Sequence, residues 1–356
     1  MAATVVGLFF RTTVVKRELS QKEELVDVAG ERNVWAALLS LLPPNNVSDN
    51  CSFEDVDKLM RSLELVIYAP TFIFGMVLNT MALVVFCILL RKWTESSIYM
   101  TNLALMDLLL LMLLPFKMHA TNNPWSSNMK SACSFFENMY FVGMYGSIYT
   151  IVCIAVHRYI AIRHPFRAQQ LRSKKISLGV CLGIWVSVLL AVSPAYSFGE
   201  ERSDTFHCFH EFSNTAWDTD LIVFLELCGF LLPATVLVVC SCLSIRGLRE
   251  SERFSKRRHA GVRIIYSSLC AFLVPFTPCH VAILLQCLVR QKIITNCEHK
   301  KSIALFVQLA LCLANITSFL DALCYYFIAK EVRSLKPTRM SVGLFMGCRR
   351  ASETNL

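Results

Sequence analysis

Charged side chains inside long apolar stretches are the residues of this chain best suited to do chemistry. Asp107 and Asp321 each lie within an apolar run, and Arg158 lies near the end of a third run, Tyr140–Ile162. A charge at membrane depth is costly, so such a residue pairs, reaches the membrane surface or performs a function. We therefore expect the acids to pair, hold a proton or bind a cation, and Arg158 to have a functional role.

Seven apolar runs supply the elements that must position these side chains. The 356 residues are 55% hydrophobic and only 17% charged, against about 25% charged in soluble domains. Each run is long enough for the roughly 20 residues of a membrane-crossing helix. The sequence therefore predicts an all-α membrane protein, a seven-transmembrane helix bundle. The runs are Leu63–Leu90, Ile98–His119, Tyr140–Ile162, Ile176–Tyr196, Leu221–Leu243, Val262–Leu288 and Ile303–Ile328.

Basic residues in the connecting segments predict the orientation. Arg163–Lys175 contains five bases and no acid, and Arg246–Arg263 contains seven bases against two acids. Because positively charged loops stay in the cytoplasm, we expect an extracellular N-terminus and a multi-pass protein of the plasma membrane. The net charge of +9 then reflects orientation and a surface for anionic lipid or a cytosolic partner. No fold motif supports binding to nucleic acid.

The ends of the chain differ in composition from the runs. We expect residues 1–60 to be a largely disordered extracellular tail, 61–328 the bundle, and 329–356 an amphipathic helix with a cytoplasmic tail. Asn46 and Asn50 begin glycosylation sequons on the expected outer side. Cys348, among basic residues near the C-terminus, is a candidate for palmitoylation.

Four of the sixteen cysteines are expected on the extracellular side: Cys51, Cys133, Cys208 and Cys297. An even set in an oxidising compartment indicates disulfides, and four cysteines allow three pairings. A Cys133–Cys208 bridge would hold the loop after the fourth span over the bundle. A Cys51–Cys297 bridge would then tie the tail to the last outer loop.

Seven spans, a cysteine at the start of the third and an arginine motif at its end resemble the rhodopsin-like (class A) G-protein-coupled receptors. The resemblance covers about Cys51 to Leu335. It implies a receptor that opens a cytoplasmic crevice to G proteins, with coupling residues His157, Arg158, Tyr159 and Tyr325. The matching positions in the other spans are Gly75, Asn79, Asn102–Asp107, Trp185, Pro233, Phe272, Pro278 and Asp321–Tyr325.

The resemblance also assigns a role to the two acids of the spans. They and their polar neighbours at matching depths resemble the receptor sodium pocket, and no other cofactor is expected. The alternative is a protonated, hydrogen-bonded pair of acids that holds the second and seventh spans together. The residues of this set are Asn79, Asp107, Ser147, Thr317, Ser318 and Asp321.

Several residue runs, Leu114–Lys117 and Met139–Ser147 among them, resemble the lysophosphatidylinositol-receptor branch of the family, also discussed as cannabinoid-like. A lysine one turn inside the extracellular mouth suits a lipid phosphate, while apolar walls take an acyl chain. The alternative for Lys117 is snorkelling to the lipid interface. The candidate ligand-binding residues are Lys117, Glu137, Tyr140, Phe141, Met144, Glu226, Phe276, His280 and Gln308.

The resemblance implies Rho-directed twelve/thirteen-class G proteins, with Gq-class coupling and arrestin as further expected partners. Phe327–Leu335 is amphipathic and predicts a short eighth helix parallel to the membrane. The C-terminal Thr354-Asn355-Leu356 fits capture by a PDZ groove.

Other functions remain open from the residues alone. The alternative ligands are a nucleotide or another lysophospholipid, because the same basic mouth would serve both. A transporter is a more remote alternative, since its repeated halves with interrupted helices are not evident in the sequence. An enzyme is not expected, because no catalytic spacing is evident.

The residue before Arg158 generates a first prediction. Most rhodopsin-like receptors carry an acid there that holds the arginine at rest, whereas this chain has His157. Resting and active states differ by a few kcal/mol, so the loss of one charge-assisted contact raises the active population. We expect appreciable ligand-free signalling, which His157→Asp lowers while ligand binding is retained. Equal basal Rho activity at matched surface density would contradict this.

Overall fold

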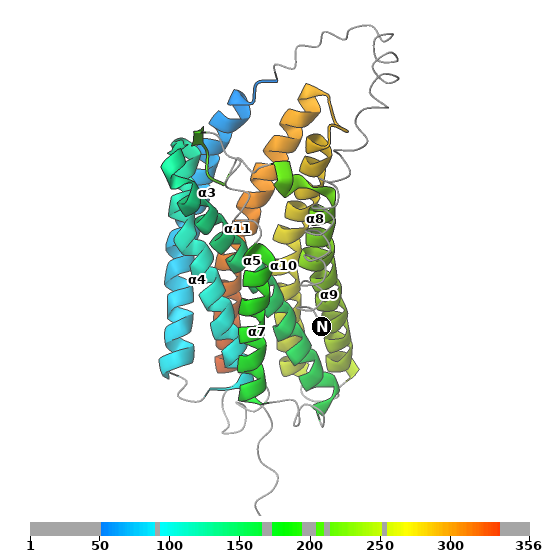
Figure 1. Ribbon diagram of the computed structural model, residues 1–356. Helices are drawn as coiled ribbons and strands as arrows, with labels where there is room; N and C mark the ends of the chain where they lie inside the picture. The colour runs from blue at the N-terminus through cyan, green and yellow to red at the C-terminus, as the bar shows by residue number, and fades with distance from the viewer. Residues whose placement is uncertain are drawn as a thin grey trace, which may run out of the picture. The chain divides into compact units, whose positions relative to one another are not determined.

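The computed structural model describes residues 51–89, 93–165, 173–193, 204–209, 214–250 and 255–334. Within these ranges, seven helices are long and apolar enough to cross a membrane, which confirms the predicted bundle. The helices are shown in Figure 1. They are α3 (Glu54–Val84, continued by the π-helix η1, Val85–Leu89), α4 (Glu95–Asn122), α5 (Lys130–Arg163), α7 (Lys174–Val192), α8–η5–α9 (Thr219–Phe224, Leu225–Leu231, Leu232–Glu250), α10 (Ser255–Arg290) and α11 (Cys297–Ser334).

Short elements connect some of these helices. The strands β1 (Trp125–Ser126) and β2 (Thr205–Phe206) pair antiparallel, with Trp125 opposite Phe206. The 3₁₀ turns η2 (Ser127–Met129) and η4 (Asn214–Trp217) precede α5 and α8. We call the end of the bundle that carries this strand pair the disulfide end, and the opposite end, where α5 finishes, the Arg158 end.

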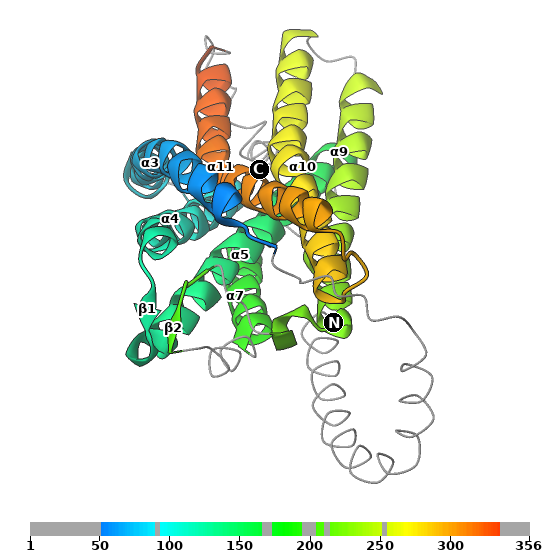
Figure 2. The same cartoon turned by 90° about the horizontal axis from the view of Figure 1, so that it is seen from above.

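Helix α5 is the element around which its neighbours pack, as the view along the bundle shows (Figure 2). It contacts α4, α7 and α9. Glycines allow the close approach to α4: a Cβ at Gly143 would lie 2.7 Å from Leu110 Cγ, and one at Gly146 only 2.5 Å from Met106 Sδ. Small residues at helix contacts are typical of membrane bundles, where close packing replaces the hydrophobic driving force.

Local sequence explains an irregularity in the fifth span. The π-helical turn η5 directly precedes Pro233. Proline has no N–H to offer to the carbonyl four residues earlier, that of Gly229, so the regular ladder of hydrogen bonds cannot continue there. The wider π turn changes which side chains of this span face the bundle.

The first helix begins earlier than expected. The sequence assigns residues 1–60 to the tail, but α3 starts at Glu54. Its first turn carries Glu54, Asp55 and Asp57, and negative charge is favourable at a helix N-terminus. Val56 and Met60 are buried, so this turn also packs. Asn46 and Asn50 lie outside the described residues.

The predicted eighth helix continues the seventh span. Residues 327–334 are helical, and they extend α11 without interruption. Leu335 and everything after it, including Cys348 and the C-terminal Thr354-Asn355-Leu356, lie outside the described residues.

Asn102 joins three helices through its side-chain amide. Its Nδ2 donates to Thr150 Oγ1 on α5 at 2.8 Å, and its Oδ1 accepts from Trp185 Nε1 on α7 at 2.9 Å. All of these groups lie within apolar spans, where water does not replace a lost partner.

We therefore predict that Asn102→Ala destabilises the bundle. The substitution removes two hydrogen bonds and leaves Trp185 Nε1 without its partner, while Thr150 Oγ1 keeps its bond to the backbone oxygen of Gly146. An unpaired buried donor costs about 1–3 kcal/mol. Thermal unfolding of purified protein in detergent should show a lower midpoint, while Asn122→Ala, at an exposed position at the end of the same helix, should leave it unchanged. An unaltered midpoint for Asn102→Ala would contradict the assigned role.

Candidate functional site

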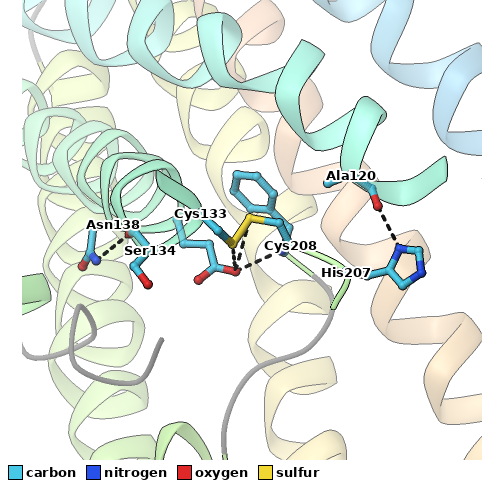
Figure 3. The surroundings of a disulfide bond; sticks show 8 residues. Ala120, Cys133, Ser134, Asn138, His207 and Cys208 are labelled. Carbon is cyan, nitrogen blue, oxygen red and sulfur yellow. Dashed lines mark hydrogen bonds between the residues drawn. A yellow bond between two sulfur atoms is a disulfide. The ribbon is translucent and has the colours of Figure 1, made fainter. Parts of the chain in front are cut away.

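A disulfide anchors the segment after α7 to the start of α5. Cys133 and Cys208 are bonded with a Cα–Cα distance of 5.8 Å, and both are buried (Figure 3). His207, which precedes Cys208 and follows β2, points away from the disulfide, with Nδ1 3.0 Å from the backbone oxygen of Ala120 (Figure 3). With the β1–β2 pair, these contacts hold residues 204–209 on the bundle.

Glu137 takes part in this anchor. Its Oε1 accepts a hydrogen bond from the backbone N–H of Phe209 at 2.9 Å, next to the disulfide. Phe209 has a φ of 69°, so a left-handed residue is held by a buried carboxylate. The sequence places Glu137 among the ligand contacts, whereas the structure uses it to hold this loop. Its closeness to Cys133 and Cys208 does not make a metal site, because both sulfurs are in the disulfide.

The second predicted bridge involves Cys51 and Cys297. Each of these two cysteines is disulfide-bonded. Apart from the four cysteines expected outside, the described cysteines have free thiols. The Cys51–Cys297 pairing itself stays a prediction.

Lys117 lies inside the bundle near the disulfide end. Only 4% of the residue is exposed, and its Nζ lies 4.9 Å from the ring centroid of Tyr140 and 5.5 Å from that of Tyr68. Tyr140 donates from its hydroxyl to Asn315 Oδ1 at 3.0 Å. Across the described residues, no carboxylate forms an ion pair with Nζ. The side chain therefore lies against aromatic faces, which attract a cation, rather than reaching out to lipid.

Glu64 is a polar member of this region that sequence analysis missed. It is buried, and its Oε2 accepts a hydrogen bond from Thr121 Oγ1 at 2.8 Å. The same hydroxyl lies 3.0 Å from the backbone oxygen of Lys117. The sequence did contain a signal for it, because Glu64 is an isolated acid at the second position of the apolar run Leu63–Leu90.

Glu226 and His280, both ligand candidates, pair with each other. Glu226 Oε1 lies 3.2 Å from His280 Nδ1, and His280 is 1% exposed. The ring of Phe230 stacks on His280 at 4.4 Å and continues through Phe272 to Phe276, with ring centroids 6.3 and 5.1 Å apart. The pair thus connects the π turn of the fifth span to α10.

The remaining ligand candidates are distributed around Lys117 and beyond it. Phe141 packs edge-on against Tyr140, with ring centroids 5.9 Å apart, and Met144 is buried one turn further along α5. Gln308 lies on α11 at a half-buried position, where its Nε2 donates to Asp57 Oδ1 at 3.4 Å.

The two acids of the spans lie in a buried polar cluster at mid-bundle. Asp107 is completely buried and accepts a hydrogen bond from Ser147 Oγ at 3.1 Å. Asn79 Nδ2 donates to the backbone oxygens of Ser318 and Gly75, each at 3.0 Å. Oxygen ligands of this kind suit a hard cation. Among the described residues, four buried oxygens of the cluster have no hydrogen-bond partner: Asn79 Oδ1, Asp107 Oδ2, Thr317 Oγ1 and Asp321 Oδ2.

At the Arg158 end, the arginine reaches α10. Its Nη1 donates to Ser268 Oγ at 3.1 Å. The ring of His157 lies 5.8 Å from that of Tyr99, and the hydroxyl of Tyr159 lies 3.3 Å from His164 Nε2. Tyr325 lies in α11, but its side chain is outside the described part of the structure.

A cavity separates Arg158 from the mid-bundle acids. Its wall combines apolar side chains with a few polar ones. The polar residues that line it are Arg158, Ser241, Ser244, Ser268 and Asp321.

A charged contact between α5 and α9 at the Arg158 end was also missed by sequence analysis. Glu250, at the end of α9, accepts from Arg163 Nη1 at 2.6 Å and from Arg246 Nε at 3.0 Å. About half of each side chain of the Arg163–Glu250 pair is exposed.

Comparison with known proteins identifies the family. Residues 78–325 match the family model described as 7 transmembrane receptor (rhodopsin family). The chain belongs to the rhodopsin family of seven-transmembrane receptors. It is therefore a multi-pass signalling receptor of the plasma membrane with G-protein partners, and not an enzyme.

Individual members of the rhodopsin family align along most of the chain. G-protein coupled receptor 55 of Mus musculus is 40% identical over 302 residues, which cover 80% of this chain and 91% of the relative. Lysophosphatidic acid receptor 4 of Homo sapiens is 32% identical over 292 residues, 80% of this chain and 78% of the relative. G-protein coupled receptor 35 of Mus musculus is 32% identical over 283 residues, which cover 76% of this chain and 86% of the relative.

The anchor at the disulfide end generates the next prediction. Cys133→Ser or Cys208→Ser should abolish surface delivery or ligand response, because residues 204–209 lose their covalent attachment to α5. Cys51→Ser or Cys297→Ser should have milder effects, because the loop they would close is peripheral. Flow cytometry and a signalling assay measure both, and peptide mapping that joins Cys51 to Cys208 would contradict the pairing.

Proposed function

We propose that this receptor is activated by a lysophospholipid, with lysophosphatidylinositol as the expected agonist. The observation that carries the proposal is the buried Lys117, whose ammonium lies over Tyr68 and Tyr140 near the disulfide end. A buried cation without a carboxylate ion pair among the described residues suits an anionic ligand group, because such a ligand supplies the missing charge.

The aromatic and apolar surroundings of Lys117 suit the rest of a lipid. Tyr140, Phe141 and Met144 follow one another along α5 and offer apolar surface beside the cation. A mostly apolar site with one well-placed charge is the usual form of a small-molecule site. Two of the relatives that align along the chain are named lysophosphatidic acid receptors, and this supports a lysophospholipid for this receptor as well.

Signal transfer would occur at the other end. We infer that the disulfide end is extracellular and that Arg158, with His157, Tyr159 and Tyr325, faces the G protein. Displacement of α10 breaks the Arg158–Ser268 hydrogen bond and enlarges the cavity beside it. The expected transducers are twelve/thirteen-class G proteins that act on Rho, with Gq-class coupling in addition. Arrestin and a PDZ protein are further expected partners.

The mid-bundle cluster suits a sodium ion. Asp107, Asp321, Asn79, Ser147, Thr317 and Ser318 would hold it, and the four unpartnered oxygens among these groups support this assignment. An ion there would stabilise the resting state, since it brings together residues of α3, α4, α5 and α11 that separate when the helices move.

A Rho-reporter assay in transfected cells tests the proposed agonist. Lysophosphatidylinositol should activate the reporter in a receptor-dependent way, whereas a panel of nucleotides should not. A response to a nucleotide and none to lysophospholipids would replace this proposal with the alternative ligand class.

The role of Lys117 leads to a further prediction. Lys117→Ala should weaken the potency of lysophosphatidylinositol by about 1.5–3 kcal/mol, the value of a hydrogen bond to a charged group. Concentration–response curves at matched surface expression provide the measurement, and Lys58→Ala, an exposed lysine near the start of α3, is the control. Unchanged potency for Lys117→Ala would place the headgroup elsewhere, at the basic residues of the loops.

A further inference from the structure

Glu64 and Thr121 form a polar contact between α3 and α4, one turn closer to the disulfide end than Lys117. Thr121 Oγ1 lies 2.8 Å from Glu64 Oε2. Glu64 is only 4% exposed, although it lies within the first ten or so residues of its helix. A buried acid here needs an explanation, because the proposed ligand is itself an anion.

The geometry places Glu64 beside the lysine site. Residues four apart on a helix lie one above the other. Tyr68 follows Glu64 by four residues on α3, and Thr121 follows Lys117 by four on α4, so the two helices face each other with two successive pairs, Glu64 with Thr121 and Tyr68 with Lys117. The first pair lies toward the disulfide end, about 6 Å along the helices from the second.

We propose that Glu64 selects the chemical class of the headgroup: the site takes a lysophospholipid whose phosphate is a diester bearing a hydroxylated group, in preference to a phosphomonoester. This rests on the proposed function, with the lipid phosphate at Lys117. Glu64 then faces whatever is attached to the phosphate on the side of the disulfide end.

Charge is the first reason for this selection. An ionised Glu64 and Lys117 together would be neutral. Their closeness follows from Thr121, whose hydroxyl lies 2.8 Å from Glu64 Oε2 and 3.0 Å from the backbone oxygen of Lys117. A phosphomonoester carries a charge of about −1.5 to −2 near neutral pH, as phosphorylated side chains do, whereas a diester carries one negative charge. Since an uncompensated charge in a dry site is costly, the neutral pair tolerates the single charge better.

Hydrogen bonding is the second reason. An ionised carboxylate is an acceptor only, and the threonine hydroxyl both donates and accepts. The hydroxyl groups of a polyol attached to the phosphate can donate hydrogen bonds to the Glu64 carboxylate. They can also donate to, or accept from, the Thr121 hydroxyl. A phosphomonoester has oxygens there that accept hydrogen bonds and repel the carboxylate.

Matched lipids on one variant test the selection. Wild type and Glu64→Gln are compared with lysophosphatidylinositol and lysophosphatidic acid that have the same acyl chain, and the ratio of the two potencies is measured. Wild type should prefer the diester. In Glu64→Gln the ratio should shift toward lysophosphatidic acid by about tenfold or more, which corresponds to about 1.4 kcal/mol.

Controls separate the charge of Glu64 from other effects. Asp57→Asn removes an acid from the exposed start of the same helix and should leave the ratio unchanged, as should Glu64→Asp, which retains the charge. Glu64→Ala is a second variant that should shift the ratio in the same direction as Glu64→Gln. The ratio is independent of the amount of receptor at the surface.

The outcomes distinguish this inference from the proposed function. If neither lipid activates wild type, the proposed function fails. If lysophosphatidylinositol acts through Lys117 but the ratio is unchanged in Glu64→Gln and Glu64→Ala, the role of Glu64 is overturned while the proposed function stands. A wild-type preference for lysophosphatidic acid would also overturn it, without any variant.

Discussion

Hydrocarbon offers no hydrogen-bond partner, so each polar side chain inside this bundle must find one within the protein or from a ligand. The structure meets this demand at separate depths. Glu137 holds the loop beside the disulfide, Asn102 joins three helices, and Asp107 accepts from Ser147. The groups left with capacity to bind something else, Lys117 above all, are then the ones available to a ligand.

Helix α5 contributes to each of these depths. From the disulfide end to the Arg158 end it supplies Glu137, Tyr140, Ser147, Thr150 and Arg158. Its partners lie on α4, α10, α11 and in residues 204–209, so a shift of α5 as a rigid body would change contacts with all of these elements. Tyr140 near one end and Arg158 at the other therefore belong to the same helix. A ligand that contacted Tyr140 and shifted α5 would also affect the hydrogen bond of Arg158.

The sequence predicts the number of spans well, because length and apolar composition are set by the membrane. It predicts the contacts of individual side chains less well, because their partners come from distant parts of the chain. The ligand roles of Glu137 and Gln308 stay predictions, but only the structure shows that Glu137 accepts from the N–H of Phe209 and that Gln308 donates to Asp57. Glu64 resembles the edge of a polar tail, and only the position of Thr121 on α4 reveals that it is buried beside Lys117.

The contacts of the Arg158 end show how the missing acid is replaced. One hydrogen bond from α5 to α10 joins Arg158 to the hydroxyl of Ser268, a charged group with a neutral partner. A charged contact of this end, Arg163 with Glu250, instead joins α5 to α9, and because about half of each side chain is exposed, solvent weakens it. Among the described residues, the ion pair thus joins α5 to the fifth span and does not involve α10. A movement of α10 away from α5 has to break the Arg158–Ser268 hydrogen bond, whereas it leaves the Arg163–Glu250 contact in place.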